Sequence, residues 1–210
     1  MIMANLGFYF DASACSGCKT CQVACQDKND LPAGIRFRRI YEVCGANWLL
    51  NEEGAWVPSI AAYNISIACN HCQEAPCTKA CPTKAMYLDA NGIVAVDPKK
   101  CIGCRYCEWA CPYGAPQYNK SLGIMQKCDL CRDYLADGKI PVCVSACPMR
   151  ALDFGPLDEL RNRYGENATL YPLPPGDSVG AGWVVKSHPG EGIARELGAR
   201  IINLEEVKNG

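Results

Sequence analysis

The chain has 210 residues and carries 17 cysteines, far more than a protein of this length ordinarily contains. Its formal charge of −1 at pH 7 excludes a strongly basic protein that binds nucleic acid through the phosphates. We predict no signal peptide at the start and no apolar stretch of the roughly 18 to 20 residues that a membrane-spanning helix needs. The cysteines therefore indicate either a disulfide scaffold or a set of metal sites.

Sixteen of the cysteines fall into four motifs of four along the chain. The third motif reads CxxCxxCxxxCP, and the second and fourth also end in CP. The fourth motif has eleven residues inserted between its second and third cysteines. The motifs are Cys15, Cys18, Cys21 and Cys25; Cys69, Cys72, Cys77 and Cys81; Cys101, Cys104, Cys107 and Cys111; and Cys128, Cys131, Cys143 and Cys147.

This spacing is typical of iron–sulfur clusters. Three cysteines spaced three residues apart place three thiolates on one tight loop, and the fourth cysteine of such a run ligates the other cluster of a two-cluster ferredoxin. Zinc needs only two CxxC pairs, so the additional cysteines would have no role there. Disulfides are disfavoured by the close spacing and the odd total, and haem attachment needs CxxCH, which does not occur. We therefore predict four [4Fe–4S] clusters.

The order of the motifs predicts how they share these clusters. The second and third motifs enclose residues 87–96, where β-branched residues flank an Asn91-Gly92 turn and predict a hairpin, as in a ferredoxin. The first and fourth motifs then pair around this module. Exchange of the fourth cysteines gives four ligand sets: Cys15, Cys18, Cys21 and Cys147; Cys25, Cys128, Cys131 and Cys143; Cys81, Cys101, Cys104 and Cys107; and Cys69, Cys72, Cys77 and Cys111.

The predicted fold class is α+β, with two ferredoxin-like modules, one nested within the other, a β insertion and an extended C-terminal tail. Short helices are expected after the third cysteine of each motif. Apolar and polar residues alternate on both sides of Gly54 and predict the β insertion. The tail is rich in Pro and Gly, so we expect it to lie on a partner subunit, with disorder as the alternative. The segments are 1–33 with the first motif, 34–68 as the insertion, 69–121 with the second and third motifs, 122–155 with the fourth motif, and 156–210 as the tail.

Residues outside the motifs receive simpler interpretations. Cys44 is expected to be a small buried hydrophobic residue of the insertion, and His71 a neighbour of the ligands or a surface group. With two histidines in the chain, no catalytic constellation is visible. Four cations stand beside ligand cysteines, where solvated charge is the default and a raised cluster potential the alternative. These candidate cofactor-binding residues are Lys19, Arg105, Lys127 and Arg132.

Several runs of the sequence resemble a known family. FRRIYE, ISIACNHC, PCTKACP, CIGCRYCEWACPYGAPQYN and KCDLC are similar to the iron–sulfur subunit of anaerobic dimethyl sulfoxide reductase, across roughly residues 6 to 160. Relatives in the larger family serve nitrate, formate, polysulfide and tetrathionate enzymes. Nitrate reductases have Trp at the position of Cys104, which leaves a three-iron cluster, so retention of this cysteine implies four cubanes.

The resemblance implies an electron-transfer subunit without a catalytic site of its own. Its partners would be a molybdopterin subunit that reduces dimethyl sulfoxide and related S- and N-oxides, and an integral membrane anchor that oxidises menaquinol. A polysulfide, tetrathionate or other molybdopterin oxidoreductase is the alternative. The expected order of the relay puts the cluster of Cys69, Cys72, Cys77 and Cys111 nearest the anchor, and that of Cys15, Cys18, Cys21 and Cys147 nearest the catalytic subunit.

The resemblance also implies a location. Family members without a signal are exported while folded and bound to a catalytic partner that carries one. We therefore expect a peripheral protein at the periplasmic face of a bacterial inner membrane, with the cytoplasmic face as the alternative.

Overall fold

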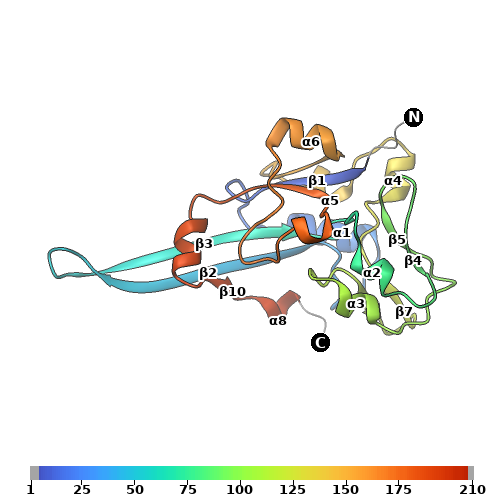
Figure 1. Cartoon of the computed structure of the whole chain (residues 1–210), viewed down its shortest axis with the longest axis horizontal. Helices are drawn as coiled ribbons and strands as arrows, with labels where there is room; N and C mark the ends of the chain where they lie inside the picture. Colours follow the sequence, from blue (N-terminus) through green and yellow to red (C-terminus); the bar gives the residue numbers. More distant parts are fainter. Residues whose placement is uncertain (1–4, 208–210) are drawn as a thin grey trace.

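The two longest strands, β2 (Arg39–Leu50) and β3 (Trp56–Ile67), form one antiparallel hairpin in the computed structural model, which describes residues 5–207. Residues 1–4 and 208–210, the outer ends of the first and last predicted segments, lie outside this range. Gly54, with φ of 78°, closes the turn between the strands. The inner half of the hairpin lies against the rest of the molecule, and its outer half projects far beyond it (Figure 1).

A three-stranded sheet joins distant parts of the chain. Its central strand, β1 (Leu6–Asp11), pairs antiparallel with β8 (Leu152–Pro156) and parallel with β9 (Trp183–Lys186). Helix α6 (Leu157–Tyr164) packs on this sheet through Leu157 and Leu160, which are buried with Tyr9 and Val184. Residues 6–11, the segment after the fourth motif and part of the predicted tail therefore form one unit.

Two small hairpins lie near the cysteine motifs in the sequence. Strands β4 (Met86–Leu88) and β5 (Val94–Val96) form the hairpin predicted around Asn91-Gly92. Strands β6 (Gln117–Asn119) and β7 (Ile124–Gln126) form a second one that was not predicted from the sequence. This second hairpin crosses the predicted boundary between residues 121 and 122, so its two strands cannot belong to separate segments.

Short helices carry the third cysteine of each motif. They begin one residue before that cysteine, not after it as expected, and α4 (Arg132–Ala136) lies in the insertion of the fourth motif. The other four-to-nine-residue helices are α1 (Thr20–Lys28), α2 (Pro76–Lys79), α3 (Tyr106–Ala110) and α5 (Val142–Ser145). No helix of residues 5–207 is long and apolar enough to cross a membrane. The chain is thus a mixed α and β protein built from small sheets and short helices.

The C-terminal residues do not form the extended tail that the sequence predicted. Leu170 is fully buried, and Trp183 is buried and donates a hydrogen bond from Nε1 to the Ala168 carbonyl at 2.9 Å. Tyr63 of the β2–β3 hairpin donates from its hydroxyl to the Tyr171 carbonyl at 2.6 Å. The expectation rested on the Pro and Gly content and overlooked the apolar residues that anchor the segment. Because the segment is buried against its own chain, its composition is no longer a reason to expect a partner there.

The remaining elements of this region lie along the β2–β3 hairpin. Helix α7 (Glu191–Glu196) contacts β3, β10 (Arg200–Ile201) pairs with β2, and α8 (Leu204–Val207) contacts β2. A short 3-10 turn, Asp177–Val179, precedes β9. One continuous core includes Phe8, most of the cysteines and residues as late as Val207. The C-terminal segment is therefore part of the folded body.

We predict that Trp183→Ala lowers the free energy of unfolding by about 3 to 5 kcal/mol, because it removes a buried aromatic side chain and its hydrogen bond. Denaturant unfolding followed by circular dichroism measures the change. Trp109→Ala is the matched control, since Trp109 is 73% exposed and its loss should cost under about 0.5 kcal/mol. Equal effects of the two substitutions would contradict the packed C-terminal segment.

Candidate metal centres

All four cysteine motifs use the same backbone turn. The residue before the second cysteine has left-handed φ in every motif: 71° at Gly17 and 68° at Gly103, but also 44° at His71 and 62° at Leu130. A non-glycine residue pays roughly 1 to 2 kcal/mol for this conformation. His71 and Leu130 are both buried, so the surrounding protein holds them there. The four loops therefore bend alike, even where the sequence lacks the glycine that would have predicted the turn.

A second shared turn fixes the last cysteine of three motifs. Proline follows this cysteine and suits the second position of a turn. The third residue after the cysteine has a left-handed φ of 52° to 58° and donates its N–H to the cysteine carbonyl. These bonds join Lys84 to Cys81 at 3.2 Å, Gly114 to Cys111 at 3.1 Å and Arg150 to Cys147 at 3.3 Å.

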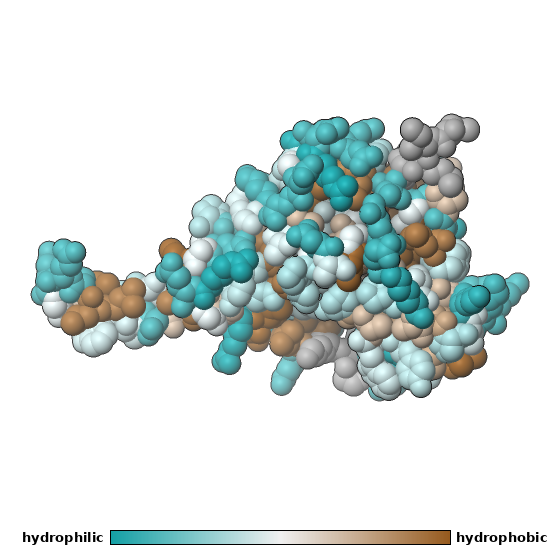
Figure 2. All heavy atoms as spheres, in the orientation of Figure 1, coloured by the Kyte–Doolittle hydropathy of each residue, from teal (hydrophilic) through white to brown (hydrophobic). Residues whose placement is uncertain are grey.

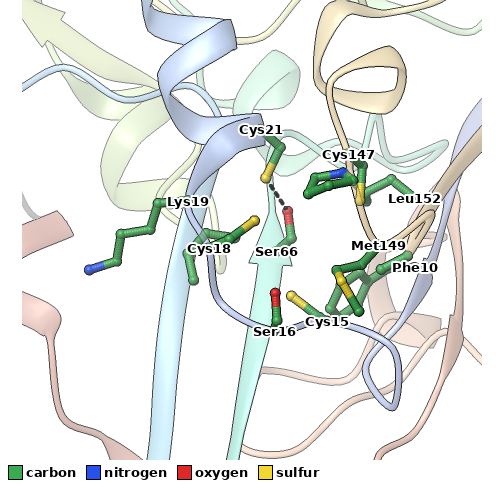
Figure 3. A pocket seen from close by; sticks show the side chains of 13 residues that line it. Phe10, Cys15, Ser16, Cys18, Lys19, Cys21, Ser66, Cys147, Met149 and Leu152 are labelled. Atoms are coloured by element: carbon green, nitrogen blue, oxygen red, sulfur yellow. Dashed lines mark hydrogen bonds between the residues drawn. The ribbon is translucent and has the colours of Figure 1, made fainter.

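The first group of thiols surrounds a cavity beside α1 (Figure 3). Its sulfur atoms point into the shared space, whereas the Lys19 side chain points away. The hydroxyl oxygen of Ser66, from β3, lies 3.4 Å from Cys21 Sγ. Cys18 is the exposed member of the group. The four thiols that line the cavity are those of Cys15, Cys18, Cys21 and Cys147.

Two further cavities repeat this composition. Each is lined by three cysteines of one motif and the last cysteine of another. The three cavities enclose similar space between protein atoms, about 300, 300 and 280 Å³, some of it open to solvent. In residues 5–207, no three Cys, His, Asp or Glu side chains are close enough to hold a single metal ion. The lining thiols are Cys81, Cys101, Cys104 and Cys107 in one cavity, and Cys25, Cys128, Cys131 and Cys143 in the other.

The remaining four thiols are also neighbours. Burial raises the pKa of Cys72 and of Cys77 to about 12, and the adjacent Cys69 and Cys111 add to the rise in both. Burial likewise raises the pKa of Cys128, with further contributions from Cys25 and Cys69. Ala68, the neighbour of Cys69 in the chain, lines the cavity of the Cys25 group, so the two groups lie next to each other.

Backbone N–H groups are aimed at several of the sulfur atoms. A hydrogen bond donated to a thiolate favours its charged form. Such donors therefore prepare the cysteines to act as metal ligands, which must be deprotonated. The bonds run from His71 to Cys69 at 3.5 Å, Met86 to Cys81 at 3.4 Å, Ala115 to Cys111 at 3.5 Å and Met125 to Cys101 at 3.4 Å.

Arg38 is a buried cation between two of the thiol groups. It is 2% exposed, and its Nη2 donates to Cys143 Sγ at 3.4 Å. Its guanidinium lies over the Phe8 ring, 4.4 Å from the centroid. No carboxylate of residues 5–207 forms an ion pair with it. Burial alone would lower the pKa of Arg38, but Cys143 and Cys21 raise it overall. Once deprotonated, the thiols of these two groups would therefore supply the negative charge opposite this cation.

Two other buried cations also lack a carboxylate partner among the described residues. Arg39 donates to the carbonyls of Tyr113 at 2.8 Å and Gly114 at 3.0 Å. Lys127 donates to the carbonyls of Cys128, at 2.8 Å, and Val94. Sequence reasoning did not single out Arg38 or Arg39, although two adjacent arginines at the start of a buried strand are an unusual signal.

The four cations that the sequence singled out differ in their surroundings. Lys127 is buried, as described above, whereas the other three side chains are bound to carboxylates near the surface. Because those carboxylates neutralise them, their charges act on the thiols only weakly. The ion pairs join Lys19 to Glu42 and Glu206, Arg105 to Glu108, and Arg132 to Asp89.

His71 and Cys44 lie outside the groups of thiols. His71 is buried, not at the surface, and its Nδ1 accepts a hydrogen bond from the Val94 N–H at 3.1 Å. Burial, with the charges of Lys127 and Arg38, holds the pKa of His71 well below its usual value, so the ring is neutral. Cys44 is only half-buried, because its position in β2 faces Ala62 across the hairpin near the surface.

Comparison with known proteins identifies the family of this chain. Residues 60–157 match the 4Fe-4S dicluster domain. Over 98% of its length the chain is 49% identical to the B subunit of anaerobic dimethyl sulfoxide reductase from Haemophilus influenzae, covering all of that protein. It is 48% identical to the B subunit from Escherichia coli over 96% of its length and 98% of the relative. The thiosulfate reductase electron transfer subunit PhsB of Salmonella typhi is 44% identical over 71% of the chain and 74% of that subunit.

These similarities cover nearly the whole chain, and the cysteine motifs lie inside the matched regions. The chain carries multiple [4Fe–4S] clusters and is an iron–sulfur subunit of an oxidoreductase complex. It belongs to the family of iron–sulfur B subunits of anaerobic dimethyl sulfoxide reductase.

Proposed function

We propose that this chain relays electrons from a quinol-oxidising membrane anchor, through four [4Fe–4S] clusters, to a molybdopterin subunit that reduces dimethyl sulfoxide and related S- and N-oxides. The observation that carries the proposal is the lining of three cavities, each by four cysteines from two motifs. The names of the similar proteins, including an electron transfer subunit, support the relay role. A polysulfide, tetrathionate or other molybdopterin enzyme is the alternative partner.

The donors fit such clusters. Each cluster would take one set of four thiolates and would supply reversible one-electron transfer. An oxidised cubane with four thiolates carries a charge of about −2, which suits a site where Arg38 and Lys127 are buried and have no carboxylate partner among residues 5–207. The assigned ligand sets are Cys15, Cys18, Cys21 and Cys147; Cys25, Cys128, Cys131 and Cys143; Cys81, Cys101, Cys104 and Cys107; and Cys69, Cys72, Cys77 and Cys111. This assignment corresponds to one ferredoxin-like module nested within another.

We revise the order of the relay that the resemblance implied. The three loop cysteines Cys69, Cys72 and Cys77 are buried. Cys69 also contributes to the raised pKa of Cys128 in the neighbouring group. Ile102 and Trp109, beside Cys101 and Cys107, are 66% and 73% exposed. An interior site suits the middle of a relay and a surface site suits its end. We therefore assign the anchor end to the Cys81 set, and the Cys69 set to the interior.

The chain itself would carry no catalytic site. Its partners would be the molybdopterin subunit and an integral anchor that oxidises menaquinol, with the complex at the periplasmic face of a bacterial inner membrane. No helix of residues 5–207 spans a membrane, so this attachment would depend on the anchor.

Metal analysis tests the cluster count. Anaerobically purified and reconstituted protein should contain about sixteen iron and sixteen acid-labile sulfide per chain, because four cubanes hold four of each. Zinc in place of iron would contradict the proposal, and a lasting value near twelve irons would remove one of the four ligand sets.

The substitution Cys104→Ser tests the third ligand set. Loss of this thiolate should convert one cluster to a three-iron form with a higher reduction potential, because a negative ligand has gone. Electron paramagnetic resonance (EPR) measures the signal, and the other clusters should keep theirs. Quinol-driven turnover should fall sharply, while donors that reduce the catalytic subunit directly should still support it. A changed signal from the Cys15 set would contradict the assignment.

Arg38→Met tests the role of the buried cation. Removing its charge should lower the reduction potential of the nearest clusters by about 50 to 100 mV, since the reduced state carries more negative charge. Arg38→Lys is the control and should restore most of the potential. Redox titration followed by EPR measures both variants, and unchanged potentials in Arg38→Met would show that this charge is compensated elsewhere.

A further inference from the structure

The outer half of the β2–β3 hairpin is an apolar arm that no other described part of the chain covers. Beyond Gly45 and Ala61 the two strands leave the body of the protein, and both continue to the turn at Gly54 (Figure 1). Apolar side chains cover this part just behind a hydrophilic tip (Figure 2). An exposed apolar surface on an isolated two-stranded ribbon is unfavourable in water and marks a binding surface.

The strand register gathers these side chains on one face. Alternate residues of a strand share a face, and directly opposite residues on the partner strand join them. Three successive pairs on one face are wholly apolar, whereas the opposite face includes the polar pair Asn47 and Ser59. We name the apolar side the arm face; it consists of the pairs Ala46 and Ile60, Trp48 and Pro58, and Leu50 and Trp56. Its large side chains are 60% to 66% exposed, at Trp48, Leu50, Trp56 and Ile60.

The arm face continues into a cluster site. Toward the base of the hairpin, the same alternation carries Glu42 and Ser66. Ser66 lies 3.4 Å from Cys21 Sγ, and Glu42 pairs with Lys19 at 3.0 Å, next to the exposed Cys18. A protein that covers the arm face would therefore also lie over the exposed side of the first cavity.

The charge of the arm indicates which kind of partner can bind it. Residues 46–60 contain no Lys or Arg, and the turn carries Glu52 and Glu53, both exposed. Anionic lipid head groups attract basic segments, so this acidic tip opposes binding to a membrane surface. A protein groove with apolar walls and a basic end matches both features of the arm.

We propose that the arm face binds an apolar groove on the catalytic subunit. Basic side chains at one end of this groove would form ion pairs with Glu52 and Glu53. This inference rests on the proposed function, because the subunit it names is the electron acceptor of the relay. Binding there would hold that subunit against the site of Cys15, Cys18, Cys21 and Cys147. The arm would therefore position the cluster from which electrons pass to the catalytic subunit.

The test uses the complex purified from anaerobic cells that produce all subunits. The double variant Trp48→Ser with Trp56→Ser should weaken binding of the catalytic subunit at least about tenfold, because exposed aromatic anchors dominate interface affinity. Leu49→Ser with Val57→Ser is the matched control, since it removes a pair of exposed apolar side chains from the opposite face of the same hairpin and should leave this binding unchanged. Unchanged binding in the double variant would overturn the proposal.

Photo-crosslinking identifies the occupant. With p-benzoylphenylalanine in place of Trp56, the crosslinked product should contain the catalytic subunit; a product with lipid, the anchor or a second copy of this chain would overturn the proposal. Glu52→Lys with Glu53→Lys should also weaken binding. Iron content and EPR of each variant should match the unmodified chain. If the unmodified chain lacked the clusters, the proposed function would be wrong. If the double variant kept its clusters and still bound the catalytic subunit as before, only the proposed role of the arm face would be wrong.

Discussion

A thiol supplied from a distant part of the chain is the constraint on which this fold depends. Each described cavity combines three cysteines of one motif with the last cysteine of another. Bringing Cys147 to the Cys15 loop also brings β8 beside β1, where Phe10 pairs with Leu152. Sheets of two or three short strands have little stability of their own, so cluster binding and folding should support each other.

The same arrangement determines the electrostatics of the interior. Burial raises the pKa of Cys25 to about 12, so this thiol is neutral at pH 7 until metal displaces its proton. Arg38 remains charged in the same region and has no carboxylate partner among residues 5–207. A lone buried cation is costly, and thiolates bound to iron provide the negative charge that offsets it. The bound clusters and the buried arginine are therefore each favoured by the presence of the other.

Local signals in the sequence predicted local structure. The Asn91-Gly92 turn and the alternation around Gly54 predicted the β4–β5 and β2–β3 hairpins. The order of the motifs predicted the thiol groups, of which three line cavities; their assignment as ligand sets stays a prediction. Features that depend on distant contacts were missed. The left-handed backbone at Leu130 is maintained by its surroundings, and the burial of Leu170 depends on the body of the protein, not on its Pro-rich neighbours. The position of Arg38 likewise becomes apparent only when β2 meets the thiols.

The C-terminal segment acquires a role from its contacts with the chain itself. Asn203 exchanges two hydrogen bonds with β2, accepting from the Glu42 N–H at 2.9 Å and donating to the Ile40 carbonyl at 3.0 Å. Glu206 then binds Lys19 at 2.8 Å, immediately after the exposed Cys18. Each exposed ion pair contributes little alone, about 0 to 1 kcal/mol, but the paired Asn203 bonds hold the segment in register. Residues 203–206 thus brace the loop that carries the exposed Cys18, and a rigid loop keeps its ligands in one geometry when the cluster changes charge.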